Sequence, residues 1–403
     1  MAKEMPAALQ KGDMIQLSID AVAFGGQGVG RFRNQVVFVP FTADGDDGTV
    51  AITEVRKRYA RGELKALTTP SPHRMAPPCT AFALCGGCQY QHIVYDHQLV
   101  IKKRQVLDAF VRIGMFADPP LADPIPSPEP WRYRGKAEVH VQWDQGLAVG
   151  FSRASSHDIC DIYQCLIVED SVNEALARLR QGVTAMSSHR GQKRRVVLWS
   201  TEGNGASPAG YIRRIVKGRE LLLPRSGFFQ ANRFLAGTLV DVVLKMSALT
   251  GRETVVDAYC GSGFFSLFLA AQARAFHGIE LAGEAVRAAK MNLMNAGIHH
   301  ARFYEGDVGA VLASVFAPKR RRVDVLVVDP PRTGLGPAVL SAIAQLRPGR
   351  MVYVSCNPAT MARDSRCLAD YGYVLMALQP LDMFPQTSHI EAVGLLTLMR
   401  PHR

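Results

Sequence analysis

The stretch VVDAYCGSGFF, residues Val255–Phe265, decides the fold of this chain. It predicts a buried strand followed by a glycine-rich loop, because glycine lets the backbone approach a ligand closely. The pair Gly261-x-Gly263 lacks the third glycine of the dinucleotide fingerprint, which weakens a nicotinamide interpretation. Open α/β sheets bind ligands beyond the carboxyl ends of their strands, so we expect a binding site at this loop.

Predicted helices and apolar strands alternate from about residue 232 onward. The strands are expected at 255–259, 277–280, 323–329 and 351–355, and the helices at 234–247, 267–272, 284–295 and 339–346. Such alternation is typical of a doubly wound α/β domain with a parallel sheet, which is the Rossmann-like arrangement.

Two acidic residues follow the next two strands in order. Glu280 ends the strand after the glycine loop, where a carboxylate can accept hydrogen bonds from both ribose hydroxyls of a nucleoside. Asp307 follows a third strand and is placed to meet an adenine amino group. A glycine loop followed by two acids in strand order favours S-adenosylmethionine as the ligand. The alternative is an ordinary turn with two helix-capping acids.

The motif Asp329-Pro330-Pro331-Arg332 ends another predicted strand. Its two prolines fix the direction in which the chain leaves the strand, so Asp329 is held at the sheet edge. There we expect it beside the methyl end of the cofactor. Similar Asp-Pro-Pro turns in amino-methyltransferases hold an exocyclic amine, so this motif alone leaves the methyl acceptor open.

Cys356 is the candidate nucleophile. It lies in Ser355-Cys356-Asn357-Pro358, directly after the apolar run at 351–354, so its thiol is expected on a sharp turn at the carboxyl edge of the sheet. The thiolate is the best nucleophile among side chains at neutral pH. The alternative for a lone cysteine is a small buried hydrophobic residue.

These groups predict methyl transfer to carbon 5 of uracil by covalent catalysis. Carbon 5 is only weakly nucleophilic, but addition of a thiolate at carbon 6 makes an enolate whose carbon 5 can attack the methyl sulfonium. The carbon-5 proton must then leave to a base before the thiol is eliminated. Glu391, in His389-Ile390-Glu391, is the candidate base, although a surface carboxylate is the usual fate of such a residue.

Three closely spaced cysteines form a separate candidate metal site. The pattern is Cys79-x5-Cys85-x2-Cys88, and Cys160 or Cys165 is available as a distant fourth ligand. Four thiolates suit either tetrahedral zinc or an iron–sulfur cluster. Structural zinc more often uses two Cys-x2-Cys pairs, so the three-plus-one spacing leans toward a cluster.

The composition indicates a soluble protein of several domains. With 403 residues the chain exceeds one ordinary core, so about two or three domains are expected. Short strands with glycine turns over residues 11–67 suit a small barrel of the OB type, and residues 131–223 read as a β-rich domain. No apolar run is long enough to cross a bilayer and the N-terminal residues show no signal core, so a cytoplasmic location is expected.

The positive charge of the chain is clustered and predicts a polyanionic partner. Lysine and arginine number 47 against 35 acidic residues, a net charge of +12. The clusters lie at 56–58, 102–104, 132–136, 193–195, 213–214 and 319–322, with 102–104 expected on the wet side of a helix at 95–113. Such clusters attract nucleic acid and would make binding depend on salt. A non-enzymatic RNA-binding module is therefore a further alternative.

The motifs together resemble the RNA uracil-5-methyltransferase family. They are Phe229-Gln230-Ala-Asn232, Asp257 to Gly263, Asp329 to Arg332, Ser355 to Pro358 and His389-x-Glu391, in the family's order. The resemblance implies a class I methyltransferase domain over 226–403, with Cys356 as nucleophile and Glu391 as base. It implies that the S-adenosylmethionine site is lined by Gln230, Tyr259, Glu280, Asp307 and Asp329. One departure is Phe264, where family members often carry a polar residue.

The resemblance extends over the N-terminal half of the chain. Residues 1–70 look like a TRAM domain, an OB-like RNA-binding module. Residues 71–225 look like a β-rich central domain with a 4Fe–4S cluster, and its helix 95–114 is expected to pack on the catalytic domain. The implied cluster ligands are Cys79, Cys85, Cys88 and Cys165. This combination resembles the enzymes that form 5-methyluridine in 23S ribosomal RNA, and the T-loop of transfer RNA is the alternative substrate. We expect the chain to be a monomer.

Overall fold

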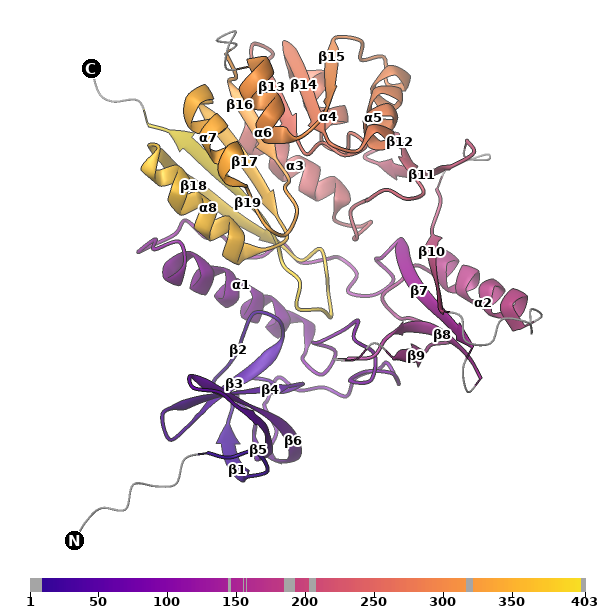
Figure 1. Cartoon of the computed structure of the whole chain (residues 1–403), viewed down its shortest axis with the longest axis vertical. Coiled ribbons are helices and arrows are strands. Elements are labelled where there is room, and N and C mark those ends of the chain that lie inside the picture. Colours follow the sequence, from indigo (N-terminus) through magenta and orange to yellow (C-terminus); the bar gives the residue numbers. More distant parts are fainter. Residues whose placement is uncertain are drawn as a thin grey trace.

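The computed structural model describes residues 9–143, 146–154, 156, 158–184, 193–202, 208–316 and 322–399 (Figure 1). Most of the basic cluster predicted at 319–322 lies outside these residues, as does the N-terminal end considered for a signal. None of the helices within the described ranges is long and apolar enough to cross a membrane.

The N-terminal domain is a single six-stranded β-sheet that curls into a barrel-like unit (Figure 1). Its order is β1-β5-β6-β4-β3-β2. The strands are β1 (Met14–Ser18), β2 (Ala21–Val22), β3 (Gln27–Phe32), β4 (Gln35–Pro40), β5 (Asp47–Val55) and β6 (Tyr59–Thr69). Alternate residues point inward, as the period of a strand requires, so Val37 and Val39 are fully buried while their neighbours are partly exposed.

Helix α1 (Tyr95–Arg112) lies between this barrel and the C-terminal domain (Figure 1). Val106 and Phe110 are fully buried and belong to a hydrophobic cluster of the C-terminal domain. The prediction that residues 102–104 share a solvent-facing side was wrong for Lys102. Its side chain is only 2% exposed, because this face of α1 docks on the C-terminal domain and Lys102 pairs there with Asp382.

In the part that the structure describes, the central domain has a four-stranded antiparallel sheet and a helix that packs on it. The sheet order is β10-β7-β8-β9. Its elements are β7 (Lys136–Trp143), β8 (Leu147–Ser152), β9 (Ile159–Asp161), α2 (Asp170–Thr184) and β10 (Lys193–Trp199). A hairpin follows, formed by β11 (Tyr211–Val216) and β12 (Arg219–Pro224). Leu221 and Leu223 of this hairpin are buried in the core of the C-terminal domain, and Trp199 at the end of β10 packs against the same cluster.

The C-terminal domain is a seven-stranded sheet between layers of helices, with the order β15-β14-β13-β16-β17-β19-β18. Its strands are β13 (Thr254–Ala258), β14 (Ala275–Glu280), β15 (Ala301–Glu305), β16 (Val325–Val328), β17 (Arg350–Ser355), β18 (Tyr373–Leu381) and β19 (Glu391–Leu398). Its helices are α3 (Ala236–Ser247), α4 (Ser266–Leu269), α5 (Gly283–Asn295), α6 (Val308–Val311), α7 (Pro337–Leu346) and α8 (Pro358–Asp370), with short turns η1 (Ala270–Gln272) and η2 (Leu312–Phe316).

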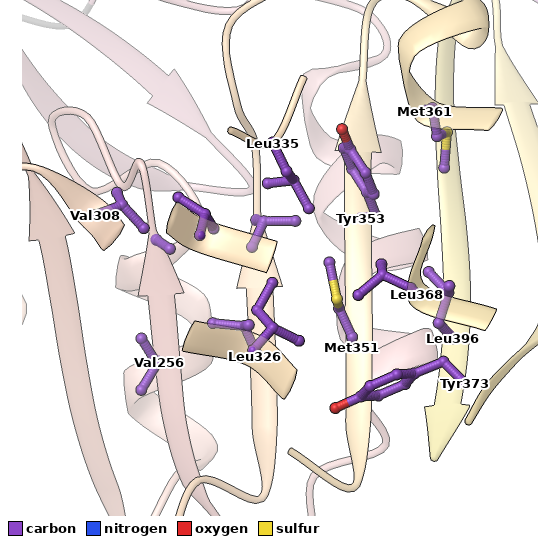
Figure 2. Close-up of a cluster of buried hydrophobic side chains, with 14 of the residues drawn as sticks. Val256, Val308, Leu326, Leu335, Met351, Tyr353, Met361, Leu368, Tyr373 and Leu396 are labelled. Atoms are coloured by element: carbon purple, nitrogen blue, oxygen red, sulfur yellow. The ribbon is translucent and has the colours of Figure 1, made fainter. Parts of the chain in front are cut away.

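The first five strands of this order are parallel, while β19 runs antiparallel to both β17 and β18. Each face of the sheet carries its own apolar cluster, and Val255 and Val256 contribute to opposite ones. Figure 2 shows one of them, in which Leu326, Met351 and Leu396 come from neighbouring strands. The predicted α/β fold is confirmed, and the loops at the carboxyl ends of the parallel strands meet at one edge.

Candidate active site

The glycine-rich loop after β13 has a backbone that favours glycine. Gly261 and Gly263 have φ angles of +52° and +86°, in the left-handed region. A Cβ atom added at Gly263 would lie 3.2 Å from the Cβ of Ala289 in α5. The loop therefore turns sharply against α5 at the carboxyl edge of the sheet, as the sequence predicted.

Glu280 lies beside this loop at the end of β14. Its carboxylate accepts hydrogen bonds from the backbone N–H of Gly261 at 3.0 Å and of Ala282 at 2.8 Å. Glu280 thus joins the glycine loop to the start of α5. Asp307 is exposed and caps α6, accepting a hydrogen bond from the N–H of Ala310 at 2.9 Å. Burial, and after it the negative charge of Asp307, raises the pKa of Tyr259 to about 12.

Two buried carboxyl groups lie deeper in the same edge. Asp257 is fully buried and accepts a hydrogen bond from Ser266 Oγ at 2.6 Å, while its Oδ1 atom has no partner in the described residues. Burial raises the pKa of Asp257 to about 7. Burial and the charge of Asp257 also raise the pKa of Asp329 to about 7. Both carboxyl groups therefore hold a proton more tightly than an exposed aspartate does.

The segment that carries Gln230 packs against the glycine loop. The ring of Phe229 meets that of Phe264 edge-on, with centroids 5.7 Å apart, and Phe264 directly follows Gly263. Phe264 is 9% exposed and packs in the core. It occupies the position at which the family resemblance leads us to expect a polar residue. Asn232 donates a hydrogen bond to Ser127 Oγ at 2.9 Å and caps the following turn, which fixes the segment around the buried Gln230.

The two proline-containing turns are joined to each other. Asn357 Nδ2 donates to the carbonyl oxygen of Arg332 at 3.1 Å, and Asn357 Oδ1 accepts from the N–H of Ala359 to cap α8. Thr360 Oγ1 also donates to the Arg332 carbonyl, at 3.3 Å. The turn after Cys356 therefore holds the turn after Asp329.

Asp364 supports these turns from α8, and no sequence pattern indicated it. This buried carboxylate accepts hydrogen bonds from Tyr353 Oη at 2.8 Å and from the N–H of Leu335 at 2.7 Å. It thereby links the strand before Cys356 to the loop after Arg332. The signal available in the sequence was a lone acid inside a helix, which is ordinary on an exposed helix face.

Cys356 and Glu391 are brought together by strand pairing. Residue Ser355 of β17 lies opposite Ala392 of β19, so Glu391 lies next to the end of β17. Cys356 is half-buried, and burial, followed by the Glu391 carboxylate, raises the pKa of its thiol to about 11. Arg332 acts in the opposite direction and lowers that pKa. The pKa of Glu391 is raised well above its usual range by burial and by Asp329.

His389 is a further side chain at this edge. Its Nε2 atom lies 3.4 Å from the guanidinium of Arg332. Burial and the positive charge of Arg332 lower the pKa of His389 to about 4, so the imidazole is neutral at physiological pH. Sequence reasoning included His389 in a motif but gave it no role.

The cysteines of the predicted metal site line one cavity of about 120 Å³ in the central domain. These are Cys79, Cys85, Cys88 and Cys165, whereas Cys160 is not among the lining residues. The backbone of Cys165 is clamped by Asn173, which accepts from its N–H at 2.9 Å and donates to its carbonyl at 3.0 Å. Within the described ranges no group of three or more Cys, His, Asp or Glu side chains is arranged to hold a metal ion. The predicted cluster therefore stays a prediction.

The α/β fold and the glycine-rich loop after β13 define the class of protein, which is an S-adenosylmethionine-dependent methyltransferase. A model of the tRNA (uracil-5-)-methyltransferase family matches residues 213–399, and a TRAM domain model matches residues 8–65. An uncharacterized RNA methyltransferase of Halalkalibacterium halodurans is 34% identical, over 99% of this chain and 100% of its own. One of Bacillus cereus is 32% identical, over 99% and 100%.

Among solved structures, the tRNA (uracil-54, C5)-methyltransferase of Pyrococcus abyssi with S-adenosyl-L-homocysteine is similar over its whole length. The TM-score is 0.72 and the identity 25%, over 94% of this chain and 100% of that one. The chain belongs to the RNA uracil-5-methyltransferase family. It is an enzyme that methylates carbon 5 of uracil in RNA with S-adenosylmethionine, and it carries a TRAM domain.

Proposed function

We propose that this enzyme works by covalent catalysis with Cys356 as nucleophile and Glu391 as base. The observation that carries the proposal is the meeting of Cys356, Glu391, Asp329 and Arg332 at one edge of the sheet. The reaction needs a nucleophile that attacks carbon 6 of uracil and a base that removes a proton from carbon 5. A thiol beside a buried carboxyl group supplies both.

The reaction proceeds in three steps. The Cys356 thiolate adds to carbon 6 of uracil, and the electron pair moves to carbon 5 and the carbonyl oxygen. Carbon 5 then takes the methyl group of S-adenosylmethionine, which leaves as S-adenosylhomocysteine. Glu391 removes the carbon-5 proton, the carbon–sulfur bond breaks, and the double bond between carbons 5 and 6 returns. The raised pKa of Glu391 makes its carboxylate a stronger base than an exposed glutamate.

The S-adenosylmethionine site is proposed at the glycine loop, with Gln230, Tyr259, Glu280, Asp307 and Asp329 around it. Tyr259, Glu280, Asp307 and Asp329 lie at the carboxyl ends of β13, β14, β15 and β16. Gln230 lies in the segment after β12, whose Phe229 ring meets that of Phe264 beside the glycine loop. The backbone of the Gly261–Gly263 turn leaves room for a close ligand, since nothing lies within 4 Å of a Cβ atom placed at Gly261.

The test is methylation of RNA by the purified protein and by Cys356→Ala. We expect 5-methyluridine in nucleoside digests with the wild type and none with the variant. Full methylation by Cys356→Ala would overturn covalent catalysis. A methyl group on adenine or guanine would favour the alternative in which the Asp-Pro-Pro turn holds an exocyclic amine.

For the substrate we propose a uridine of 23S ribosomal RNA, in keeping with the TRAM domain and the cysteine site. The alternative is the T-loop of transfer RNA, which the similarity to the Pyrococcus abyssi tRNA enzyme favours. Nucleosides of both RNAs from a strain without the gene separate these outcomes. Loss of 5-methyluridine from ribosomal RNA supports the first, and loss only from transfer RNA supports the second. Either uridine must be unstacked to reach Cys356.

We further propose that Cys79, Cys85, Cys88 and Cys165 hold a 4Fe–4S cluster. The four thiols line one cavity, and four cysteine thiolates are the ligand set of a 4Fe–4S cluster. Cys79, Cys85, Cys88 and Cys165 would hold the cluster through their thiolates, which would link residues 79–88 to the loop of Cys165.

Anaerobic purification with iron and sulfide analysis tests the cluster. We expect the wild type and Cys160→Ser to retain iron and sulfide, because Cys160 does not line the cavity. Cys165→Ser is expected to lose both. Zinc in place of iron, or equal iron in Cys165→Ser and Cys160→Ser, would contradict the proposal.

A further inference from the structure

The loop that leads to Glu391 is held mainly by residues from outside the methyltransferase domain. It runs from Asp382 to His389 and will be called the base loop. Lys102 Nζ in α1 donates to the carbonyl oxygen of Phe384 at 2.9 Å. Tyr133 Oη donates to the carbonyl of Pro385 at 3.0 Å.

Gln386 is the centre of these contacts. Its φ angle is +68°, a left-handed conformation that costs a non-glycine residue about 1–2 kcal/mol. Its carbonyl oxygen accepts two hydrogen bonds at 3.0 Å, from the N–H groups of Gln89 and Tyr90. Its own N–H donates to Gln98 Oε1 at 3.0 Å, and Gln98 Nε2 donates to its side-chain oxygen at 3.0 Å. The strained turn is therefore fixed from two directions.

Gln89 also reaches the residue next to His389. Its Oε1 atom accepts from the N–H of Ser388 at 3.1 Å, while its Nε2 donates to the carbonyl of Gly86 at 2.9 Å. Gln89 directly follows Cys88, so one side chain connects the cysteine segment with the base loop. The N-terminal barrel packs closely against this contact between Gln89 and Ser388. A Cβ atom added at Gly26 of the barrel would lie 2.8 Å from Gln89 Cβ and 3.3 Å from Ser388 Cβ.

We propose that Gln89 and Gln98 are positioning residues for catalysis, which set the base loop and thereby the place of Glu391 beside Cys356. This inference rests on the proposed roles of Glu391 and Cys356. Gln386 is only a few residues before Glu391, and Ser388 is adjacent to His389. A shift of the turn at Gln386 is therefore transmitted along the backbone to Glu391, the proposed base. Folding of the cysteine segment and removal of the carbon-5 proton are thus coupled.

Gln89→Ala is the main test, because Gln89 is half-buried and its loss leaves no cavity in a core. Misplacement of a catalytic group by about 1 Å can cost on the order of 100-fold, so we expect kcat to fall roughly 10- to 100-fold. The KM for RNA should stay within about twofold. Because proton removal follows methyl transfer, the slowed step should leave more enzyme covalently joined to RNA, measured on a denaturing gel.

Matched variants make the result specific. Gln89→Glu keeps the oxygen that accepts from Ser388 but loses the donor to the Gly86 carbonyl, so it should recover part of kcat. Gln98→Ala should behave like Gln89→Ala, and the exposed Gln181→Ala in α2 should equal the wild type. Glu391→Gln gives the reference level of trapped adduct. Equal kcat in Gln89→Ala and Gln181→Ala, or a lower kcat without more adduct, would overturn the proposal.

The proposed function fails separately from this inference. If Cys356→Ala loses methylation while Gln89→Ala and Gln98→Ala retain full kcat, the function stands and the positioning role is wrong. If the wild type forms no adduct and Cys356→Ala still methylates, covalent catalysis is wrong and the role of these glutamines falls with it.

Discussion

Removal of the buried lysine on α1 should destabilise the protein far more than removal of its neighbour. Lys102 and Asp382 form an ion pair at 2.6 Å with side chains 2% and 0% exposed. Lys103 pairs with Asp123, but those side chains are 40% and 89% exposed. The two lysines are adjacent on one helix, so Lys102→Met and Lys103→Met differ almost only in burial.

The magnitude follows from what each substitution leaves behind. Lys102→Met leaves the Asp382 charge buried without its partner, which costs about 3–5 kcal/mol. It also leaves the carbonyl of Phe384 without one of its donors. Lys103→Met removes an exposed pair worth about 0–1 kcal/mol. At roughly 2–4 °C per kcal/mol for a domain of this size, a loss of about 4 kcal/mol lowers Tm by about 8–16 °C.

Thermal unfolding followed by circular dichroism measures the difference. The double variant Lys102→Met, Asp382→Leu should recover most of the lost Tm, because replacing both charges removes the uncompensated one. Equal Tm values for Lys102→Met and Lys103→Met would refute the view that α1 docks through a buried ion pair. A double variant as unstable as Lys102→Met would show that packing, and not the charge, sets the cost.

Two further predictions concern the site itself. Alkylation of Cys356 by iodoacetamide, followed by mass spectrometry, should accelerate about tenfold per pH unit between about pH 8 and 10, because a thiol with a pKa of about 11 forms little thiolate at lower pH. Arg332→Ala should slow the alkylation, because Arg332 lowers that pKa. An alkylation rate that reaches a plateau below pH 9 would contradict this prediction. Gly263→Ala should lower Tm more than Gly261→Ala in thermal unfolding, because only the first adds a close contact with α5 to the backbone strain of about 1–2 kcal/mol. Equal Tm values of the two variants would argue against that close contact.

Much of the catalytic edge was predictable because parallel strands share a direction. Once the strands at 255–259 and 351–355 are predicted from their apolar runs, the residues after them must meet at one edge of the sheet. The glycine loop, Asp329 and Cys356 were found in this way. Left-handed φ angles at Gly261 and Gly263 follow equally from local chemistry, because glycine alone adopts them without strain.

Local pattern could not place residues whose surroundings come from distant parts of the chain. Lys102 has the sequence context of an exposed helix face, yet docking of α1 on the C-terminal domain buries it beside Asp382. Asp364 and Gln386 have ordinary contexts too, and only packing gives them hydrogen bonds to other segments. The choice between Cys160 and Cys165 depended likewise on which thiol faces the cavity.

The sequence by itself determined the candidate reactive groups and the edge where they lie, because strand periodicity and turn chemistry act over a few residues. The tertiary structure alone decided how the candidate base reaches them. Strand β19 enters the sheet antiparallel to β17, which sets Ala392 opposite Ser355 and Glu391 next to the Cys356 turn. That pairing belongs to the order of the whole sheet, in which segments far apart in the sequence become neighbours, and no short-range pattern records it.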